Sequence, residues 1–130
     1  MMFQHKVAVI TGGVQGIGKC IGEEFQKNGA SVCIIDKQPN EYFTGDVADK
    51  ETLHRFAEKV IADYGYVDYL INNALPLMKG ISHCSYEEFN YALQVGVAAP
   101  FYLTKLFLPY FAPGAAIVNL SSSRDRMSQP

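Results

Sequence analysis

The chain has 130 residues, which is enough for one folded domain with a sizeable core. Hydrophobic residues make up 48% of the sequence, charged residues make up 18%, and the net charge is -2. This composition is typical of a soluble globular protein, and without a basic excess it argues against nucleic acid or an anionic lipid surface as a partner. No apolar run approaches the length of a membrane span and the N-terminus has no signal-peptide pattern, so we expect a cytoplasmic protein.

The first predicted elements are a strand and a helix joined by a glycine-rich turn. Residues 6–10 form the short apolar strand, and the helix begins near Gly16 and ends at Asn28, where Gly29 can adopt the left-handed conformation. Apolar residues at helical spacing predict one buried face of this helix, formed by Ile17, Cys20, Ile21 and Phe25. Cysteines in apolar segments without CxxC spacing predict buried thiols in a reducing compartment, at Cys20, Cys33 and Cys84.

The middle of the chain continues the alternation of strand and helix. Residues 31–35 form a continuous apolar strand that ends in Asp36, and a short third strand at residues 42–44 follows a loop. Asp49 is the predicted N-cap of the second helix. The apolar residues of that helix follow the helical period closely, at Leu53, Phe56, Ala57, Val60, Ile61 and Tyr64.

A fourth strand, a long helix and a fifth strand complete the pattern. The fourth strand is predicted at residues 67–71 and the fifth at residues 115–120. Between them, Ser85 and Glu88 have capping-box spacing at the start of a helix that reaches Phe111 and is interrupted by Pro100. This helix is apolar nearly all round, so we expect it to be buried on the sheet and against a partner chain.

The alternation from end to end predicts an α/β fold in which a parallel sheet is covered by helices on both faces. We expect a Rossmann-type doubly wound sheet with strand order 3-2-1-4-5, and a ligand at the edge where the order reverses. Residues 1–130 are interpreted as one domain.

The glycine-rich turn TGGVQGIG at residues 11–18 is the strongest functional signal. A helix N-terminus presents unpaired N–H groups and the positive end of its dipole, and glycine lets a phosphate approach the backbone. The strand before the turn and the helix after it favour a dinucleotide site over a purely structural turn. The predicted pyrophosphate-binding residues are Thr11, Gly12, Gln15, Gly16, Ile17 and Gly18.

Asp36 at the end of the second strand predicts the cofactor. A carboxylate there can accept hydrogen bonds from both ribose hydroxyls, and it would repel a 2′-phosphate, which favours NAD over NADP. Lys37 beside it could accommodate that phosphate, so NADP stays open. A solvated turn aspartate is the remaining alternative.

Five separately placed motifs together resemble the short-chain dehydrogenase/reductase family. They are TGGVQGIG at residues 11–18, Asp36, Gly-Asp-Val at residues 45–47, Asn-Asn-Ala at residues 72–74 and IVNLSS at residues 117–122. The resemblance implies hydride transfer between a nicotinamide and a secondary alcohol or ketone. It also implies that Asp46 and Val47 line the adenine pocket, that residues Asn72, Asn73 and Ala74 shape the floor near the cofactor, and that Val95 touches the cofactor. Family members further tend to form homodimers or homotetramers, here through the helix from Ser85 to Phe111.

By the same resemblance, Ser122 is the catalytic serine that hydrogen-bonds the substrate oxygen. The family's YxxxK element, which supplies the tyrosine acid/base and a lysine, is not reached before Pro130. We therefore expect the N-terminal, cofactor-binding part of a longer enzyme; the alternative is a nucleotide-binding regulatory or interaction module without catalysis.

Two residues depart from the family pattern: Leu75 stands where glycine is usual, and Gly96 stands where an asparagine supports a proton relay. Leu75 could narrow the entrance beside the nicotinamide. No ligand-like cluster includes His5, His54 or His83, so no metal is expected.

Overall fold

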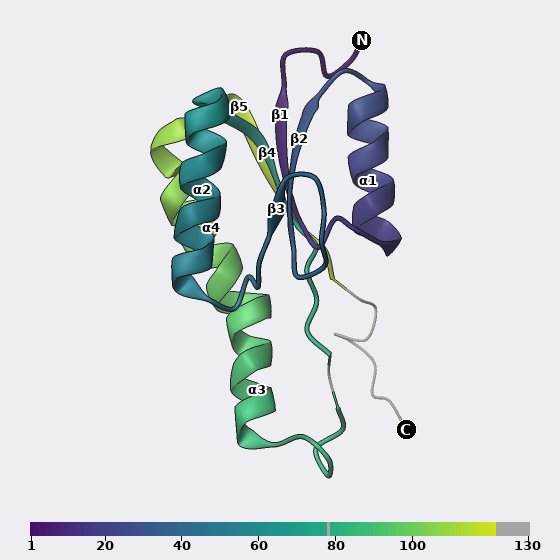
Figure 1. Cartoon of the computed structure of the whole chain (residues 1–130), viewed down its shortest axis with the longest axis vertical. Coiled ribbons are helices and arrows are strands. Elements are labelled where there is room, and N and C mark those ends of the chain that lie inside the picture. Colours follow the sequence, from purple (N-terminus) through teal and green to yellow (C-terminus); the bar gives the residue numbers. More distant parts are fainter. Residues whose placement is uncertain (78, 122–130) are drawn as a thin grey trace.

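The computed structural model describes residues 1–77 and 79–121. Five parallel strands form one sheet in the order β3-β2-β1-β4-β5, so the predicted fold class and strand order are confirmed. Figure 1 shows α1 on one face of this sheet and α2 with α4 on the other. The strands are β1 (Val7–Thr11), β2 (Ser31–Asp36), β3 (Phe43–Thr44), β4 (Val67–Asn72) and β5 (Phe111–Asn119). The helices are α1 (Gly16–Lys27), α2 (Lys50–Tyr64), α3 (Tyr86–Leu93) and α4 (Ala99–Phe107).

The central strand β1 is buried along its whole length. It pairs with β2 on one side and β4 on the other, so Val9 lies between Cys33 and Leu70. A parallel strand covered by helices on both faces has no solvated side, which explains why its sequence is a continuous apolar run. Phe56 of α2 and Phe107 of α4 fill the larger core on one face of the sheet.

Helix α1 packs on the sheet through two glycines, and part of its predicted apolar face is exposed. Its buried residues are Gly18 and Gly22, whereas Ile17 is 67% exposed and Cys20 is also exposed. The predicted face was therefore wrong at those two positions. Two glycines one turn apart let the helix backbone approach the sheet, which rotates the apolar side chains away from the contact. The cysteine prediction needs the same correction, because only Cys33 is buried.

Helix α2 begins at its predicted N-cap. The carboxylate of Asp49 accepts a hydrogen bond from the N–H of Thr52 at 2.9 Å and caps the N-terminus. Gly65 ends the helix in the left-handed conformation, with φ of 81°. Leu53, Phe56 and Val60 are buried in the core, as the helical spacing predicted, but Tyr64 at the last turn is exposed, so the prediction was wrong there.

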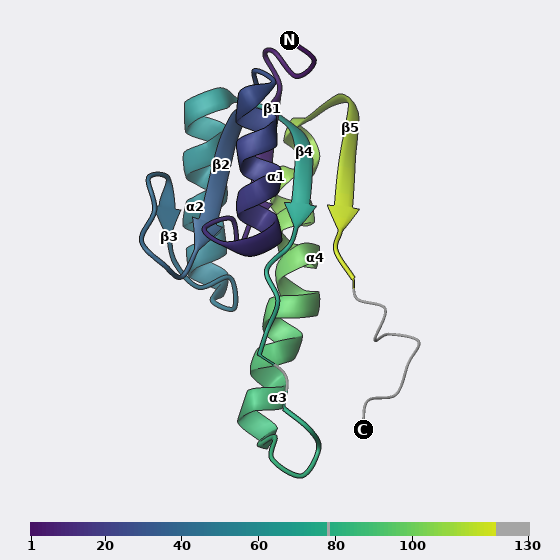
Figure 2. The same ribbon diagram turned by 90° about the vertical axis from the view of Figure 1, so that its right-hand side faces the viewer.

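The long helix predicted from Ser85 to Phe111 is a continuous helical stretch, Tyr86–Tyr110, made of four segments. The capping box of Ser85 and Glu88 is confirmed at the start of α3. A π-helical segment, Gln94–Ala98, joins α3 to α4, and a 3-10 turn follows at Leu108–Tyr110. Pro100 has no N–H to donate to the carbonyl four residues before it, which accounts for the interrupted hydrogen-bond pattern at this position. In both views α3 extends past the carboxyl ends of the strands (Figures 1 and 2).

Strand β5 begins four residues before the predicted strand, at Phe111. Its register against β4 shifts between Val67 and Tyr69, and Gly114 has φ of 81°. Pro113 and Gly114 lie in this irregular part of the strand. β5 is the outer strand of the sheet, where Ile117 and Val118 are each 43% exposed.

The helical stretch Tyr86–Tyr110 also meets the length and composition of a membrane span, with a mean hydropathy of 1.2 over its most apolar window. The expectation that no segment approaches that length is corrected here. Leu103 and Phe107 of this stretch are buried in the core and α4 packs against α2, while 28% of the most apolar window is buried.

Candidate functional site

The glycine-rich turn between β1 and α1 is held in place from β4. The side-chain amide of Asn73 donates to the carbonyl oxygens of Thr11 at 3.1 Å and Gly12 at 2.8 Å. The Thr11 hydroxyl accepts hydrogen bonds from the N–H groups of Asn73 at 3.0 Å and Ala74 at 2.9 Å. Thr11 is only 3% exposed, so its side chain supports the turn from the buried side, and the backbone forms the outer surface of the turn.

The glycines of the turn have different structural roles. A Cβ on Gly18 would collide with the Asn73 side chain and the Gly12 carbonyl, so Gly18 allows α1 to start directly against the turn. Gly16 has φ of 60°, and a Cβ there would meet nothing within 4 Å. Gly16 therefore borders open space at the mouth of the turn, where a Cβ would occupy the approach to the backbone.

The N-terminus of α1 differs from the N-termini of α2 and α3. Within the described residues, Gln15 makes no side-chain cap to α1, and the first turn of α1 has no acidic residue. Helix α2 is capped by Asp49 and α3 by Ser85, and both carry glutamates in their first turns. Among the described residues, neither a side-chain cap nor a carboxylate of the first turn therefore neutralises the positive dipole end of α1, which suits an anionic ligand.

Asp36 lies at the end of β2, directly beside the glycine-rich turn. Its Oδ2 accepts a hydrogen bond from the N–H of Val14 at 3.1 Å, and its Oδ1 accepts one from the N–H of Gln38 at 2.9 Å. These two bonds fix the carboxylate, and each oxygen keeps a second lone pair for a ligand hydroxyl. The side-chain amide of Gln38 also donates a hydrogen bond to Oε1 of Gln15 at 3.4 Å, which connects the β2–β3 loop to the turn.

Lys37 and Asp46 are joined through Tyr91 of α3. The Tyr91 hydroxyl donates to Oδ2 of Asp46 at 2.6 Å, and the Lys37 ammonium donates to the Tyr91 hydroxyl at 3.1 Å. Burial and the hydrogen bond to Asp46 raise the pKa of Tyr91, while the hydrogen bond to Tyr91 raises the pKa of Lys37. The sequence patterns did not single out Tyr91, because nothing local relates it to residues 45 and 54 positions away.

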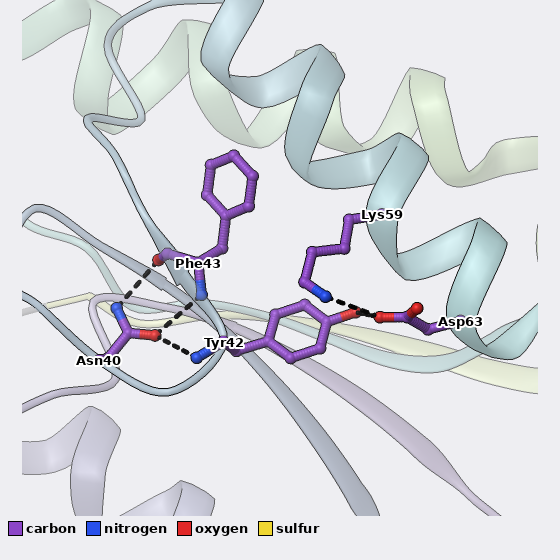
Figure 3. Close-up of polar contacts among 5 residues, drawn as sticks. All are labelled: Asn40, Tyr42, Phe43, Lys59 and Asp63. Atoms are coloured by element: carbon purple, nitrogen blue, oxygen red, sulfur yellow. Dashed lines mark hydrogen bonds and ion pairs between the residues drawn. The ribbon is translucent and has the colours of Figure 1, made fainter.

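The part of the β2–β3 loop next to β3 is braced by polar contacts (Figure 3). Oδ1 of Asn40 accepts from the N–H groups of Tyr42 at 2.8 Å and Phe43 at 2.9 Å. The Tyr42 hydroxyl at 2.7 Å and the Lys59 ammonium at 3.0 Å both donate to Asp63 of α2. This brace was missed by the sequence analysis, and it holds the loop that follows Asp36 and Lys37.

The other predicted site residues lie around this edge or outside the described residues. Val47 and Val95 are both buried in the main core, beneath the surface near Asp46 and Tyr91. Leu75 is exposed on the segment that leaves β4, and Gly96 lies in the π-helical segment. Ser122 lies outside the residues that the structure describes.

Among residues 1–77 and 79–121, no three His, Cys, Asp or Glu side chains are grouped to hold a metal ion. The residues at the sheet edge fit a dinucleotide instead. An open glycine backbone at an uncapped helix start suits a diphosphate, and a fixed carboxylate one strand away suits a ribose. The sheet order reverses beside β1, where ligands of such folds bind.

Fold and turn together define a Rossmann-type domain. A family model described as short chain dehydrogenase matches residues 6–130, and the chain belongs to the short-chain dehydrogenase family.

Known proteins of this family align with nearly the whole chain. General stress protein 39 of Bacillus subtilis is 30% identical, over 96% of this chain and 50% of that protein. An apo SCOR enzyme from Clostridium thermocellum is 40% identical with a TM-score of 0.87, over 95% of this chain and 56% of that one. A metagenomic short-chain oxidoreductase in complex with NADP is 26% identical with a TM-score of 0.86, over 93% and 63%. The chain thus spans between half and two thirds of the length of these relatives.

Proposed function

We propose that this chain forms the cofactor-binding part of an NAD(P)-dependent oxidoreductase that interconverts a secondary alcohol and a ketone. Residues 1–130 are taken as one dinucleotide-binding domain in this proposal. The observation that carries it is the open backbone at Gly16, the first residue of α1, whose N-terminus has no side-chain cap. Family membership and the NADP complex of the metagenomic relative support the same reading.

The residues of the turn would hold the diphosphate through backbone N–H groups of Gly16, Ile17 and Gly18 at the start of α1. Thr11 and Asn73 would not contact the diphosphate but would hold the turn in place through their hydrogen bonds on its buried side. Asp36 would accept the ribose hydroxyls, and its negative charge supports NAD as the preferred cofactor. When bound, the nicotinamide supplies the hydride acceptor or donor.

The adenine end would lie near Asp46, where Tyr91 and the Asp46 carboxylate form the polar surface over buried Val47 and Val95. Ala74 would lie at the floor of the cofactor site, since its N–H donates a hydrogen bond to the Thr11 hydroxyl beneath the turn. Ser122 would hydrogen-bond the substrate oxygen and stabilise developing alkoxide charge. A small-molecule alcohol or carbonyl compound and a cytoplasmic location belong to the same proposal.

Fluorescence titration with NADH tests this function directly. Saturable binding to the folded chain supports the proposal, and its absence removes it. Binding without turnover in the full-length protein, assayed with a panel of secondary alcohols, would favour a nucleotide-binding module instead.

We also propose that copies of this chain associate through α3 and α4. One side of this pair is buried in the core, but Leu93, Val97 and Phe101 on the other side are exposed. They line a shallow apolar hollow together with Asn90, Gln94 and Ala98. A contiguous apolar surface of this kind is typical of a protein interface, and family members associate through the equivalent helix.

A further inference from the structure

The contacts of Tyr91 connect three separate segments at the adenine end of the proposed site. Lys37 follows β2, Asp46 follows β3, and Tyr91 comes from α3. Tyr91 donates to Asp46 at 2.6 Å and accepts from Lys37 at 3.1 Å, so one hydroxyl serves both charges. Oδ1 of Asp46 is separately held by the N–H of Ala48 at 2.9 Å, which gives the Tyr91–Asp46 pair a fixed anchor.

This arrangement separates the two neighbouring charges at the end of β2, those of Asp36 and Lys37. The Asp36 carboxylate is turned toward the glycine-rich turn, where it accepts from Val14. The neighbouring Lys37 ammonium is turned toward α3, where Tyr91 accepts its hydrogen bond. Its nitrogen also lies 5.4 Å from the centroid of the Tyr91 ring, within the range of a cation–π contact.

A ribose 2′-phosphate needs a nearby cation to offset the charge of Asp36. Lys37 is the adjacent candidate, but to serve that phosphate its ammonium must leave the Tyr91 hydroxyl. We propose that Tyr91 is a specificity-determining residue, which tethers Lys37 away from the ribose and so disfavours NADP relative to NAD. This inference rests on the proposed cofactor-binding function and adds a residue outside the glycine-rich turn and Asp36.

The pKa values agree with the tether. Burial, followed by the hydrogen bond to Asp46, raises the pKa of Tyr91, so its hydroxyl stays protonated and donates to Asp46. The hydrogen bond from Lys37 to Tyr91 raises the pKa of Lys37, so the lysine stays charged while it is held. Both groups therefore keep the protonation states that the bridge requires.

Tyr91→Phe removes the hydroxyl and keeps the ring. We expect the ratio of the NADPH and NADH dissociation constants, measured by isothermal titration, to fall about three- to tenfold, since the tether is one hydrogen bond. The matched control is Tyr102→Phe on α4, where the Lys50 nitrogen lies 5.6 Å from the centroid of the tyrosine ring. This control should leave the ratio unchanged.

A double-mutant cycle with Lys37→Ala assigns the effect to the lysine. In the Lys37→Ala background, Tyr91→Phe should no longer change the ratio. The pKa of Lys37, followed by NMR without any cofactor, should fall in Tyr91→Phe. An unchanged ratio of the two dissociation constants in Tyr91→Phe overturns the inference, and this includes the case in which Lys37 pairs with Asp46 instead. A change in the ratio that persists in the Lys37→Ala background overturns it as well. If the wild type binds neither cofactor, the proposed function fails as well.

Discussion

The side-chain amide of Asn73 donates to the carbonyl oxygen of Gly12 at 2.8 Å, across 61 residues of sequence. This bond ties the end of β4 to the glycine-rich turn after β1. Two motifs that look independent in the sequence therefore form one structural unit, in which Asn73 and Thr11 support a turn whose outer backbone is left open.

The first prediction concerns the support of that turn. Thr11→Val keeps the side-chain shape but leaves the N–H groups of Asn73 and Ala74 without the hydroxyl acceptor. We expect the free energy of unfolding, measured with urea, to fall by about 2–4 kcal/mol. Thr11→Ser keeps the acceptor and loses one methyl group, so it should cost about 1 kcal/mol. Equal losses in the two variants would show that the hydroxyl does not support the turn.

Removal of the Asp36 charge tests the choice of cofactor. Asp36→Asn keeps the shape and one acceptor oxygen but removes the repulsion of a 2′-phosphate. We expect the NADPH-to-NADH ratio of dissociation constants to fall about tenfold, which corresponds to ~1.4 kcal/mol. Glu58→Gln on α2 removes a carboxylate that pairs with His54 and should leave the ratio unchanged. A ratio unaffected by Asp36→Asn would place Asp36 away from the ribose.

The regular parts of this fold could be predicted because their signals are local. The alternation of elements predicts a parallel sheet, whose strand order was expected from the Rossmann arrangement. The caps at Asp49 and Ser85 follow from residue type and spacing. The packing of α1 could not be predicted in the same way, because Gly18 and Gly22 carry no apolar side chain and yet make the closest contact.

The candidate site was predictable in its glycine-rich turn and at Asp36, where motif and position coincide. The bridge through Tyr91 was not, because its hydrogen bonds join residues that only the folded chain brings together. The brace of Asn40 and Tyr42 was missed for the same reason. Side-chain partners across elements depend on tertiary geometry that a periodic pattern does not contain.

Association through α3 and α4 is testable with one charge. Val97→Lys places an ammonium in the exposed apolar surface, and burial of that charge against a partner would be unfavourable. We expect sedimentation velocity to show a shift from oligomer to monomer. Leu77→Lys, at a side chain that is also exposed but lies before α3, should leave the oligomer intact. An unchanged oligomer in Val97→Lys would exclude this surface as the interface.

The start of α3 should give the protein a measurable acid dependence. The hydrogen bond from Lys79 at 2.6 Å, helped by the N–H of Ser85, lowers the pKa of Glu88 from 4.5 to about 2. Because the folded pKa is depressed, the stabilisation is present above pH 4.5 and is lost as the pH falls toward 2.

The free energy of unfolding of Glu88→Gln should therefore differ from that of the wild type at neutral pH. The difference should shrink through that same acid window in urea titrations. Glu87→Gln removes a neighbouring carboxylate but keeps the pair with Lys79, so its acid limb should follow the wild type more closely. A Glu88→Gln difference that is constant with pH would contradict the assignment.

The most direct test of the central claim compares two glycines of the same geometry. Gly16 and Gly65 both have positive φ, 60° and 81°, and a Cβ at either would meet nothing within 4 Å. Alanine at either position should lower the free energy of unfolding by about 1 kcal/mol through backbone strain alone. In NADH titrations of the folded proteins, Gly16→Ala should weaken binding more than about tenfold while Gly65→Ala binds as the wild type does. Equal NADH affinity in both variants, or no binding by the folded wild type, would contradict a dinucleotide site at this turn.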